Sequence, residues 1–183
     1  MGGDFLQNGR GAVQDVPVVP LNETKTKLIE SGRYARQRRQ WRGQRKPESF
    51  TFLGFQHVCA NVGQGGFVVR RITDGSRKRR KLREIRQQLW RRMHEPIAST
   101  GEWLRSVLNG YYQYHAVPGN LRALERFRYS VERLWRAALR RRGDKRKPSW
   151  EQLHPIFKFW LPHPVVVHPL PSVRFDARIQ GRS

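Results

Sequence analysis

The sequence is poor in cysteine and contains no long apolar run. Cys59 is the only cysteine among the 183 residues, so no disulfide can form within the chain, and a reducing compartment such as the cytoplasm is expected. No apolar stretch reaches the length of a membrane span. The N-terminus has no basic segment followed by an apolar one, so we predict no signal peptide and a soluble cytoplasmic protein.

Sequence motifs for catalysis and metal binding are missing as well. There is no YxDD box, which binds metal ions in many polymerases, and no GxSxG, P-loop or GxGxxG motif. The six histidines show no ligand spacing, and a single cysteine cannot build a zinc site or a CxxC pair. We therefore predict no catalytic residue, no metal site and no cofactor.

Acidic residues are scarce relative to basic ones. The chain has 37 lysines and arginines against 14 aspartates and glutamates, which gives a formal net charge of +23 at pH 7. Such a charge favours polyanionic partners, and the arginine majority favours nucleic acid, because guanidinium groups bind phosphate in a fork and stack on bases. Hydrophobic residues still make up 37% and aromatic residues 11%, which is too apolar for a disordered basic tail, so a folded core is expected.

The first third of the chain predicts a disordered end followed by short strands. Residues 1–20 carry several glycines and prolines without any sustained period and are predicted to be disordered. Thr26 to Glu30 predicts a strand, residues 33–48 a basic loop, and Phe50 to Cys59 a second strand rich in aromatic and β-branched residues. A glycine-rich turn and a returning strand from Phe67 to Ile72 complete a hairpin.

Two helices are predicted next. The first runs from Arg77 to Glu95, and its apolar residues recur on one face at helical spacing. A capping box, Ser99-x-x-Glu102, opens the second helix, which stops before Pro118. The apolar face of the first helix consists of Leu82, Ile85, Leu89 and Met93.

A third helix and a shorter fourth one follow, so the predicted fold class is α+β. Asn120 caps the third helix, which continues to Arg142 before a glycine. Ser149-x-x-Gln152 opens the fourth, Pro155 breaks or restarts it, and the chain after Pro162 is extended. Five tryptophans are expected to anchor the core or its interfaces: Trp90, Trp103, Trp135, Trp150 and Trp160.

The third predicted helix is strongly amphipathic. At about 100° per residue, one face is apolar and the opposite face carries arginines around one tyrosine. Solvated helix faces normally mix charges of both signs, but only Glu125 and Glu132 offset this stripe. A row of guanidinium groups can follow a phosphate backbone, and a tyrosine can stack on an exposed base. The predicted nucleic-acid-binding stripe is Arg122, Arg126, Tyr129, Arg133, Arg136 and Arg140.

A second basic block surrounds the start of the first predicted helix. A folded basic surface is favoured over a localisation tag, because an amphipathic apolar period follows the basic run at once. A basic surface supplies affinity rather than sequence choice, so binding should weaken steeply with salt. The candidate residues of this block are Arg70, Arg71, Arg79, Arg80, Arg83 and Arg91.

Four segments, in this order, resemble the C-terminal part of bacterial group II intron reverse transcriptases, also called maturases. They are Lys25-Thr26, the segment Phe52-Leu53-Gly54-Phe55, the segment from Tyr111 to Asn120, and the helix and proline segment from Trp150 to Pro162. The resemblance implies that residues 21–75 are the last palm strands. Residues 76–183 would be the thumb and maturase-specific domain.

The resemblance also implies roles for single residues. Leu53, Gly54 and Phe55 would form the primer grip beside the primer terminus of a complete enzyme. Lys25 would correspond to the palm lysine that helps the departing pyrophosphate, although a solvent-facing lysine is favoured here because the catalytic aspartates are absent. Palm strands without their partners leave open edges, so we expect residues 1–48 to be poorly ordered alone.

Several functions remain open from the sequence. The leading hypothesis is an RNA-binding maturase fragment that assists folding and splicing of group II intron RNA, and that would contact DNA or an RNA–DNA duplex only within a complete enzyme. Polymerase activity of the chain on its own is not expected. A non-functional remnant of a mobile element and a general nucleic-acid-binding protein are alternatives, and binding to a membrane surface ranks last. The sequence predicts no oligomeric state.

Overall fold

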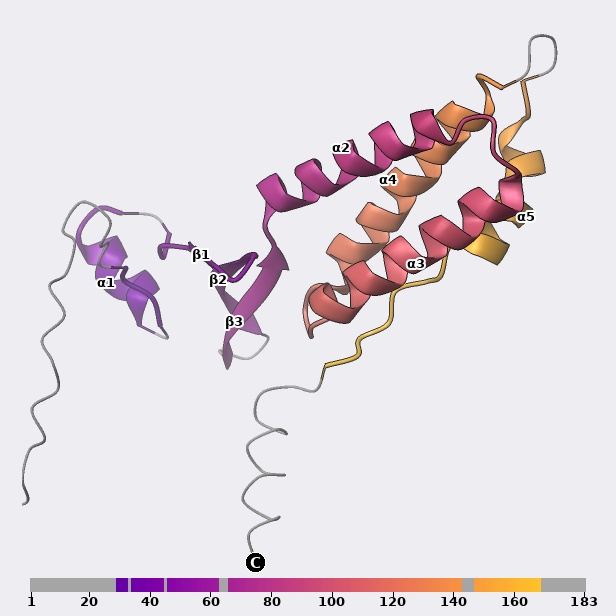
Figure 1. The fold of residues 1–183 in the computed structure, drawn as a ribbon. Coiled ribbons are helices and arrows are strands. Elements are labelled where there is room, and N and C mark those ends of the chain that lie inside the picture. Colours follow the sequence, from indigo (N-terminus) through magenta and orange to yellow (C-terminus); the bar gives the residue numbers. More distant parts are fainter. Residues whose placement is uncertain (1–28, 33, 45, 63–65, 143–146, 169–183) are drawn as a thin grey trace, which may run out of the picture.

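A small antiparallel sheet precedes a group of helices in the computed structural model, which describes residues 29–32, 34–44, 46–62, 66–142 and 147–168 (Figure 1). This arrangement confirms the α+β class. The elements in chain order are α1 (Ala35–Trp41), β1 (Phe50–Phe52), β2 (Phe55–Val62), β3 (Gly66–Thr73), α2 (Gly75–Arg91), α3 (Ile97–His115), α4 (Leu121–Leu139) and α5 (Trp150–Trp160).

The sheet contains a turn that the sequence did not predict. Leu53 and Gly54 both have positive φ, 46° and 79°, and reverse the chain between β1 and β2, with Phe52 paired to Phe55. Positive φ at both turn residues is the geometry of a tight hairpin that matches strand twist. The single strand predicted from Phe50 to Cys59 is therefore wrong, whereas the return of β3 along β2 is confirmed.

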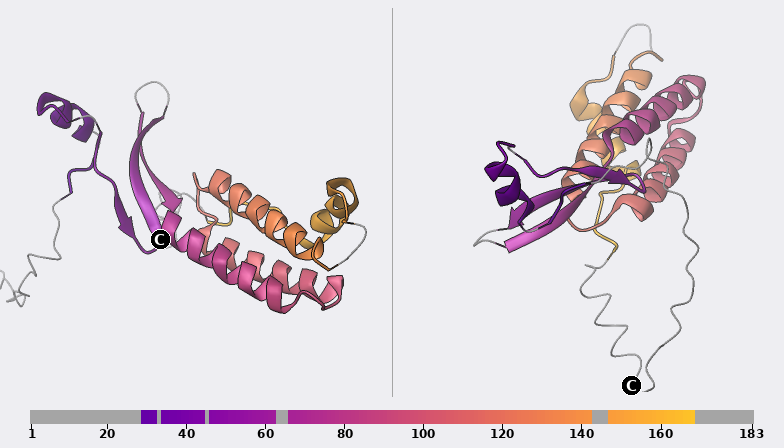
Figure 2. Two further views of the ribbon diagram at one scale, coloured as in Figure 1. Left: turned by 90° about the horizontal axis from the view of Figure 1, so that it is seen from above. Right: turned by 90° about the vertical axis from the view of Figure 1, so that its left-hand side faces the viewer.

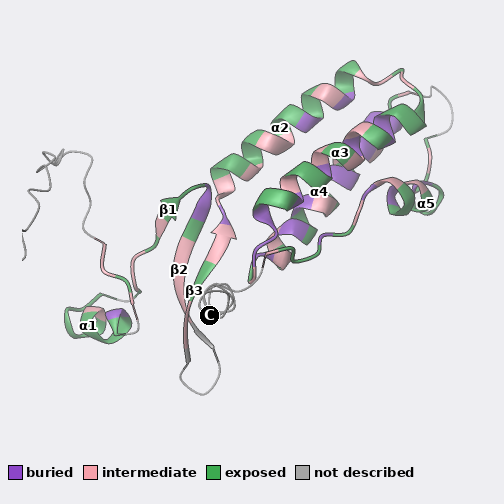
Figure 3. Cartoon of the chain, turned by 60° about the horizontal axis from the view of Figure 1, so that its bottom comes forward, coloured by how far each residue is buried: buried purple, intermediate pink, exposed green. Residues whose placement is uncertain are grey.

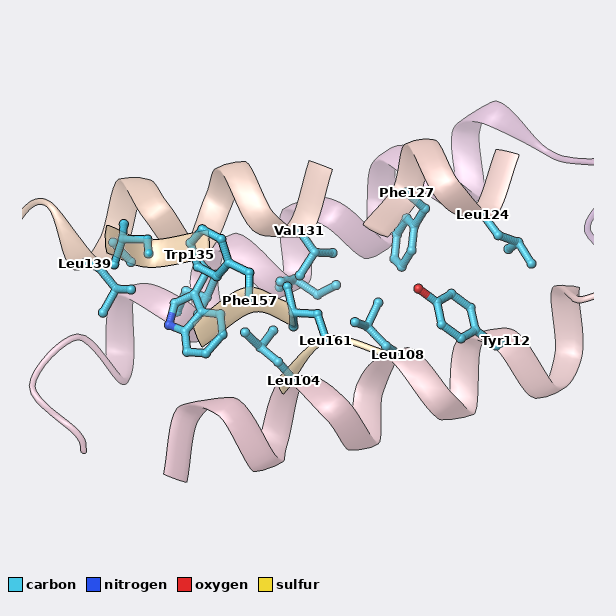
Figure 4. Close-up of a cluster of buried hydrophobic side chains, with 14 of the residues drawn as sticks. Leu104, Leu108, Tyr112, Leu124, Phe127, Val131, Trp135, Leu139, Phe157 and Leu161 are labelled. Atoms are coloured by element: carbon cyan, nitrogen blue, oxygen red, sulfur yellow. The ribbon is translucent and has the colours of Figure 1, made fainter. Parts of the chain in front are cut away.

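Helices α2 to α5 share one hydrophobic core. Figure 4 shows labelled side chains of α3 and α4 pointing toward one another, with Phe157 and Leu161 from the α5 region between them. Trp135 and Phe157 are 1% exposed, and their ring centroids are 5.4 Å apart. Figure 3 shows that buried residues concentrate on the inner sides of α3 and α4, while α1 is mainly exposed. The apolar faces predicted for the first and third helices are thus confirmed as core, including Ile85 and Leu89.

The helix boundaries differ from the prediction at several caps. Asp74 caps α2 by accepting from the backbone N–H groups of Ser76 and Arg77, so α2 begins before Arg77. The Ser149 capping box of α5 is confirmed. The box predicted at Ser99 is wrong, because α3 begins at Ile97 after Pro96 and both box residues are exposed within the helix.

Two predictions fail because tertiary contacts override local signals. Pro155 neither breaks nor restarts α5, since Leu153 and Phe157 on either side of it are buried and secure the helix. For Trp90 only the core alternative is wrong, because the residue is 52% exposed; it contacts Arg141 beyond the end of α4. The other predicted anchors are buried or pack partly buried against the core, in agreement with the prediction, as is seen for Trp103.

The N-terminal part shows one further correction. The loop predicted over residues 33–48 contains α1. Arg38 of α1 and Arg42, which follows the helix, contact Glu30 at 3.1 and 2.7 Å, and Arg39 of α1 contacts Glu48 at 3.7 Å. The expectation of poor order over residues 1–48 stays a prediction. Residues 1–20, Lys25 and Thr26 lie outside the described residues.

Candidate nucleic-acid interface

The outer face of α4 carries the predicted basic stripe. Leu124, Phe127, Val131 and Trp135 face the core with at most 1% exposure, so the opposite side of the helix faces away from the bundle. Among the described residues, no carboxylate lies within ion-pair distance of this stripe. The exposed stripe residues are Arg122, Arg126, Tyr129, Arg133 and Arg140.

The two acidic residues of α4 lie differently from each other. Glu132 is 7% exposed and pairs with Arg128 on the side of α4 that faces α5. The Arg128 guanidinium also donates to the carbonyl of Leu161 at 3.1 Å, so this pair fastens α5 to α4. Glu132 therefore does not offset the stripe, and Glu125 alone remains exposed on α4. The stripe is more one-sided in charge than the sequence suggested.

One member of the stripe is partly withdrawn from solvent. The Arg136 guanidinium lies 5.2 Å from the centroid of the Trp150 ring, a cation–π distance, and the residue is half-buried. Tyr129 contacts the edge of the same indole at 6.3 Å between centroids. Trp150 therefore holds Arg136 against α5, while Tyr129 keeps 54% of its side chain exposed.

The predicted cations of α2 are also exposed. Arg79, Arg80, Arg83 and Arg91 all reach solvent. Arg80 is the only one of these with a described carboxylate within 4.0 Å, since its Nε lies 3.9 Å from Glu84. At that distance and exposure the pair contributes little. Arg80 is therefore not committed to an internal contact.

Helices α2 and α4 run side by side and leave a groove of about 500 Å³ between them. Arg83 and Arg86 of α2 and Arg133 of α4 line it. Leu82 and Leu134 supply apolar surface, and no carboxylate is among the described lining residues. Arg86 was not among the predicted site residues, because only the packing of α2 beside α4 brings it to the groove.

The candidates on the sheet are separate from this helix pair. Arg70 and Arg71 lie on β3 opposite Val58 and His57 of β2. Arg70 is exposed and Arg71 half-buried. The hairpin extends beyond the N-terminal end of α2 (Figures 1 and 2). The structure therefore brings together the cations of α2 and α4 but leaves these two apart.

The turn predicted to resemble a primer grip packs against the helices. The hydroxyl of Tyr114 donates to the Leu53 carbonyl at 2.6 Å, and the Asp74 N–H donates to the Gly54 carbonyl at 2.9 Å. Phe55 is 7% exposed and stacks on Tyr114 with centroids 5.6 Å apart, so its ring is not free for a ligand. A Cβ at Gly54 would lie 3.0 Å from the Arg77 guanidinium, so the absence of a side chain at Gly54 lets Arg77 pack closely against the turn. Leu53 is the member that reaches solvent, 64% exposed.

The segment from Tyr111 to Asn120 forms the other half of this joint. The predicted capping role of the Asn120 side chain is wrong: its carbonyl accepts from the Thr73 N–H at 3.0 Å, and its amide donates to Thr73 Oγ1 and to the His115 carbonyl. Burial raises the pKa of Tyr111 to about 12. Burial, together with the nearby charge of Arg77, lowers the pKa of His115 to about 4. This cluster connects β3 to the end of α3.

Comparison with known proteins adds no assignment, since no family of known proteins, curated protein or solved structure matches the chain. Within the described ranges, no group of three or more histidine, cysteine or acidic side chains could hold a metal ion. No helix in this part of the chain is long and apolar enough to cross a membrane. The chemistry that the arrangement supports is phosphate binding by arginines and stacking on Tyr129.

Proposed function

We propose that the chain binds RNA in the cytoplasm and acts as a maturase-like fragment that assists folding and splicing of group II intron RNA. The supporting observation is the outer face of α4, where exposed arginines have no described carboxylate partner. The opposite face of the same helix is buried core, so the stripe is fixed in space by the fold. A fixed row of guanidinium groups suits a polyanion with regularly spaced charges.

Charge distribution distinguishes this face from an ordinary solvated surface. Surface helices gain stability from ion pairs at i,i+4, and such a pair exists in α4 between Arg128 and Glu132, on the face that contacts α5. The stripe carries no such pairs among the described residues. The chain has a net charge of +23, so the arginines of the stripe repel one another and the other cations of the chain. Binding of phosphate groups relieves this repulsion most directly.

The intron-specific part of the proposal depends on the four resembling segments. Three of them meet at the C-terminal end of α3: Tyr114 contacts Leu53, and the Tyr112 hydroxyl donates to the Pro162 carbonyl at 3.3 Å. A shared structural joint gives a physical reason for these segments to occur together. These contacts assign no RNA partner.

A filter-binding titration tests the proposal. The full chain should bind folded group II intron RNA more tightly than random RNA of equal length at about 150 mM salt. The variant Arg126→Gln/Arg133→Gln/Arg140→Gln should weaken binding and reduce the log–log salt slope by about 2, since each phosphate neutralised on a single strand contributes roughly 0.7. Far-UV circular dichroism should stay unchanged, because all three side chains are exposed.

A charge-matched control separates the stripe from net charge. Arg36→Gln/Lys147→Gln/Lys158→Gln removes the same number of exposed cations outside α4 and should lower affinity much less. Equal losses of RNA affinity in the two variants would mean that the stripe contributes only through the net charge of the chain. Equal affinity for intron and random RNA would remove the intron-specific role, and tighter binding to duplex DNA would favour a general nucleic-acid-binding protein.

A further inference from the structure

The groove between α2 and α4 concentrates positive charge from two helices. Arg83 and Arg86 approach from α2 and Arg133 from α4, around a volume of about 500 Å³. Arg83, Arg86 and Arg133 are all exposed, and no described acidic side chain lines the groove. Packing of α2 on α4 thus places like charges near one another without internal compensation.

Part of the groove lining is apolar. Leu82, Leu134 and Ala137 line it beside the arginines. A cleft with low-dielectric walls and charges of one sign focuses the electric field and attracts counter-ions more strongly than a flat surface with the same charges. Apolar lining also suits a ribose, whose carbon atoms need no hydrogen-bonding partner. The groove therefore combines features that match a sugar–phosphate chain.

Trp90 contacts Arg86 of the groove and also Arg141. The Arg141 guanidinium lies 4.5 Å from the centroid of the Trp90 ring, and that of Arg86 lies 5.9 Å away. Both distances permit cation–π attraction. Trp90 is 52% exposed although it is large and aromatic, so its location is explained by these two contacts rather than by the core.

We infer that the α2–α4 groove is a binding site for the phosphodiester backbone of single-stranded RNA, in which Arg83, Arg86 and Arg133 contact phosphate and Trp90 is a positioning residue for Arg86. The inference rests on the proposed RNA binding and adds a defined path for the strand. That path crosses from α4 to α2 instead of following the α4 stripe alone. Trp90 acts through the guanidinium groups and does not itself stack on a base.

Binding of a single-stranded oligouridylate by the full chain tests the inference, with an RNA duplex of the same length as a second probe. The variant Arg83→Gln/Arg86→Gln leaves the α4 stripe intact. It should raise Kd for the single strand about tenfold or more, since charge-assisted hydrogen bonds are the strong ones, and reduce the salt slope by about 1.4. The control Lys147→Gln/Lys158→Gln should change Kd by less than about threefold.

Trp90 variants supply an independent measurement. Trp90→Ala should raise Kd several-fold without changing the salt slope, because no charge is lost, and Trp90→Phe should restore most of the affinity through its ring. Equal Kd for the arginine variant and its control, or wild-type binding by Trp90→Ala, would overturn the groove assignment while RNA binding stands. A loss with the duplex but not with the single strand would also overturn it. Failure of the wild-type chain to bind either probe at about 150 mM salt, while it still binds folded group II intron RNA, would also overturn the groove assignment; failure with the intron RNA as well would refute the proposed function itself.

Discussion

Two glycines of α3 respond oppositely to the same substitution. A Cβ at Gly101 would lie 2.4 Å from Cδ2 and 2.5 Å from Cγ of Trp160, whereas a Cβ at Gly110 would meet no atom within 4 Å. Both residues lie within the helix Ile97–His115. Replacing glycine by alanine inside a helix gains about 1 kcal/mol from propensity in either place. The difference between them therefore isolates the contact with the indole.

The clash at Gly101 outweighs that gain. Cγ of Trp160 is the first ring atom, so relief needs a rotation of the entire indole or a shift of α5. Arg105 opposes such a shift, since it lies 4.9 Å from the ring centroid and donates to the Phe159 carbonyl at 2.6 Å. Overpacking of a well-filled site costs about 1–3 kcal/mol. Gly101→Ala should thus be destabilised by up to about 2 kcal/mol and Gly110→Ala stabilised by up to about 1 kcal/mol.

Thermal and urea unfolding monitored by circular dichroism measure the difference. The two variants differ by the overpacking cost of about 1–3 kcal/mol. At about 2–4 °C per kcal/mol for a chain of this size, their Tm values should differ by roughly 2–12 °C. A double-mutant cycle with Trp160→Ala provides the control: in that background Gly101→Ala should no longer destabilise the protein. If Gly101→Ala proves as stable as Gly110→Ala, the packing of Trp160 on α3 described above is incorrect.

The joint between the hairpin and the helices gives two further predictions. Asn120→Ala should lower the free energy of unfolding by about 2–4 kcal/mol, because buried partners at Thr73 and His115 lose their hydrogen bonds. The control Asn109→Ala, at an exposed position of α3, should leave the free energy of unfolding unchanged in the same urea titration. Equal values for the two variants would contradict this account. The pKa of His115 is lowered to about 4 in the folded state, so the contribution of this residue to stability is fully present above about pH 6.5 and declines as the pH falls toward 4. In urea titrations at several pH values, His115→Phe should reduce this decline of the unfolding midpoint, while the exposed control His154→Gln should leave it unchanged. An unaltered pH profile in His115→Phe would exclude His115 as the source of the decline.

The parts of the fold with regular sequence periods were predictable. The apolar period of α4 placed Leu124, Val131 and Trp135 in the core, and each is at most 1% exposed. The capping box at Ser149 also identified the start of α5, because its hydrogen bonds are local to four residues. Period and caps are properties of a short segment, so no tertiary information was needed for them.

Features that depend on distant contacts were not predictable in the same way. The β1–β2 turn uses Leu53 and Gly54 rather than the Asn-Gly or Asp-Gly pairs that mark such turns, and Tyr114 holds it from α3. Pro155 remains helical because neighbouring side chains are buried. For the candidate site, the exposed stripe could be predicted, but the inclusion of Arg86 required knowledge that α2 packs beside α4.

The location of the acidic side chains connects the fold to the proposed interface. Asp74 caps α2, and the hydrogen bond from the Ser76 hydroxyl is the main reason its pKa is lowered, so this carboxylate is committed to the helix start. Glu95 pairs with Arg92 at the corner between α2 and α3, and Glu132 fastens α4 to α5. These three acidic side chains are held by contacts within the fold, and the exposed arginines of α4 have no described carboxylate within 4.0 Å. This distribution of acidic side chains therefore leaves exposed arginines of α2 and α4 available for the proposed phosphate contacts.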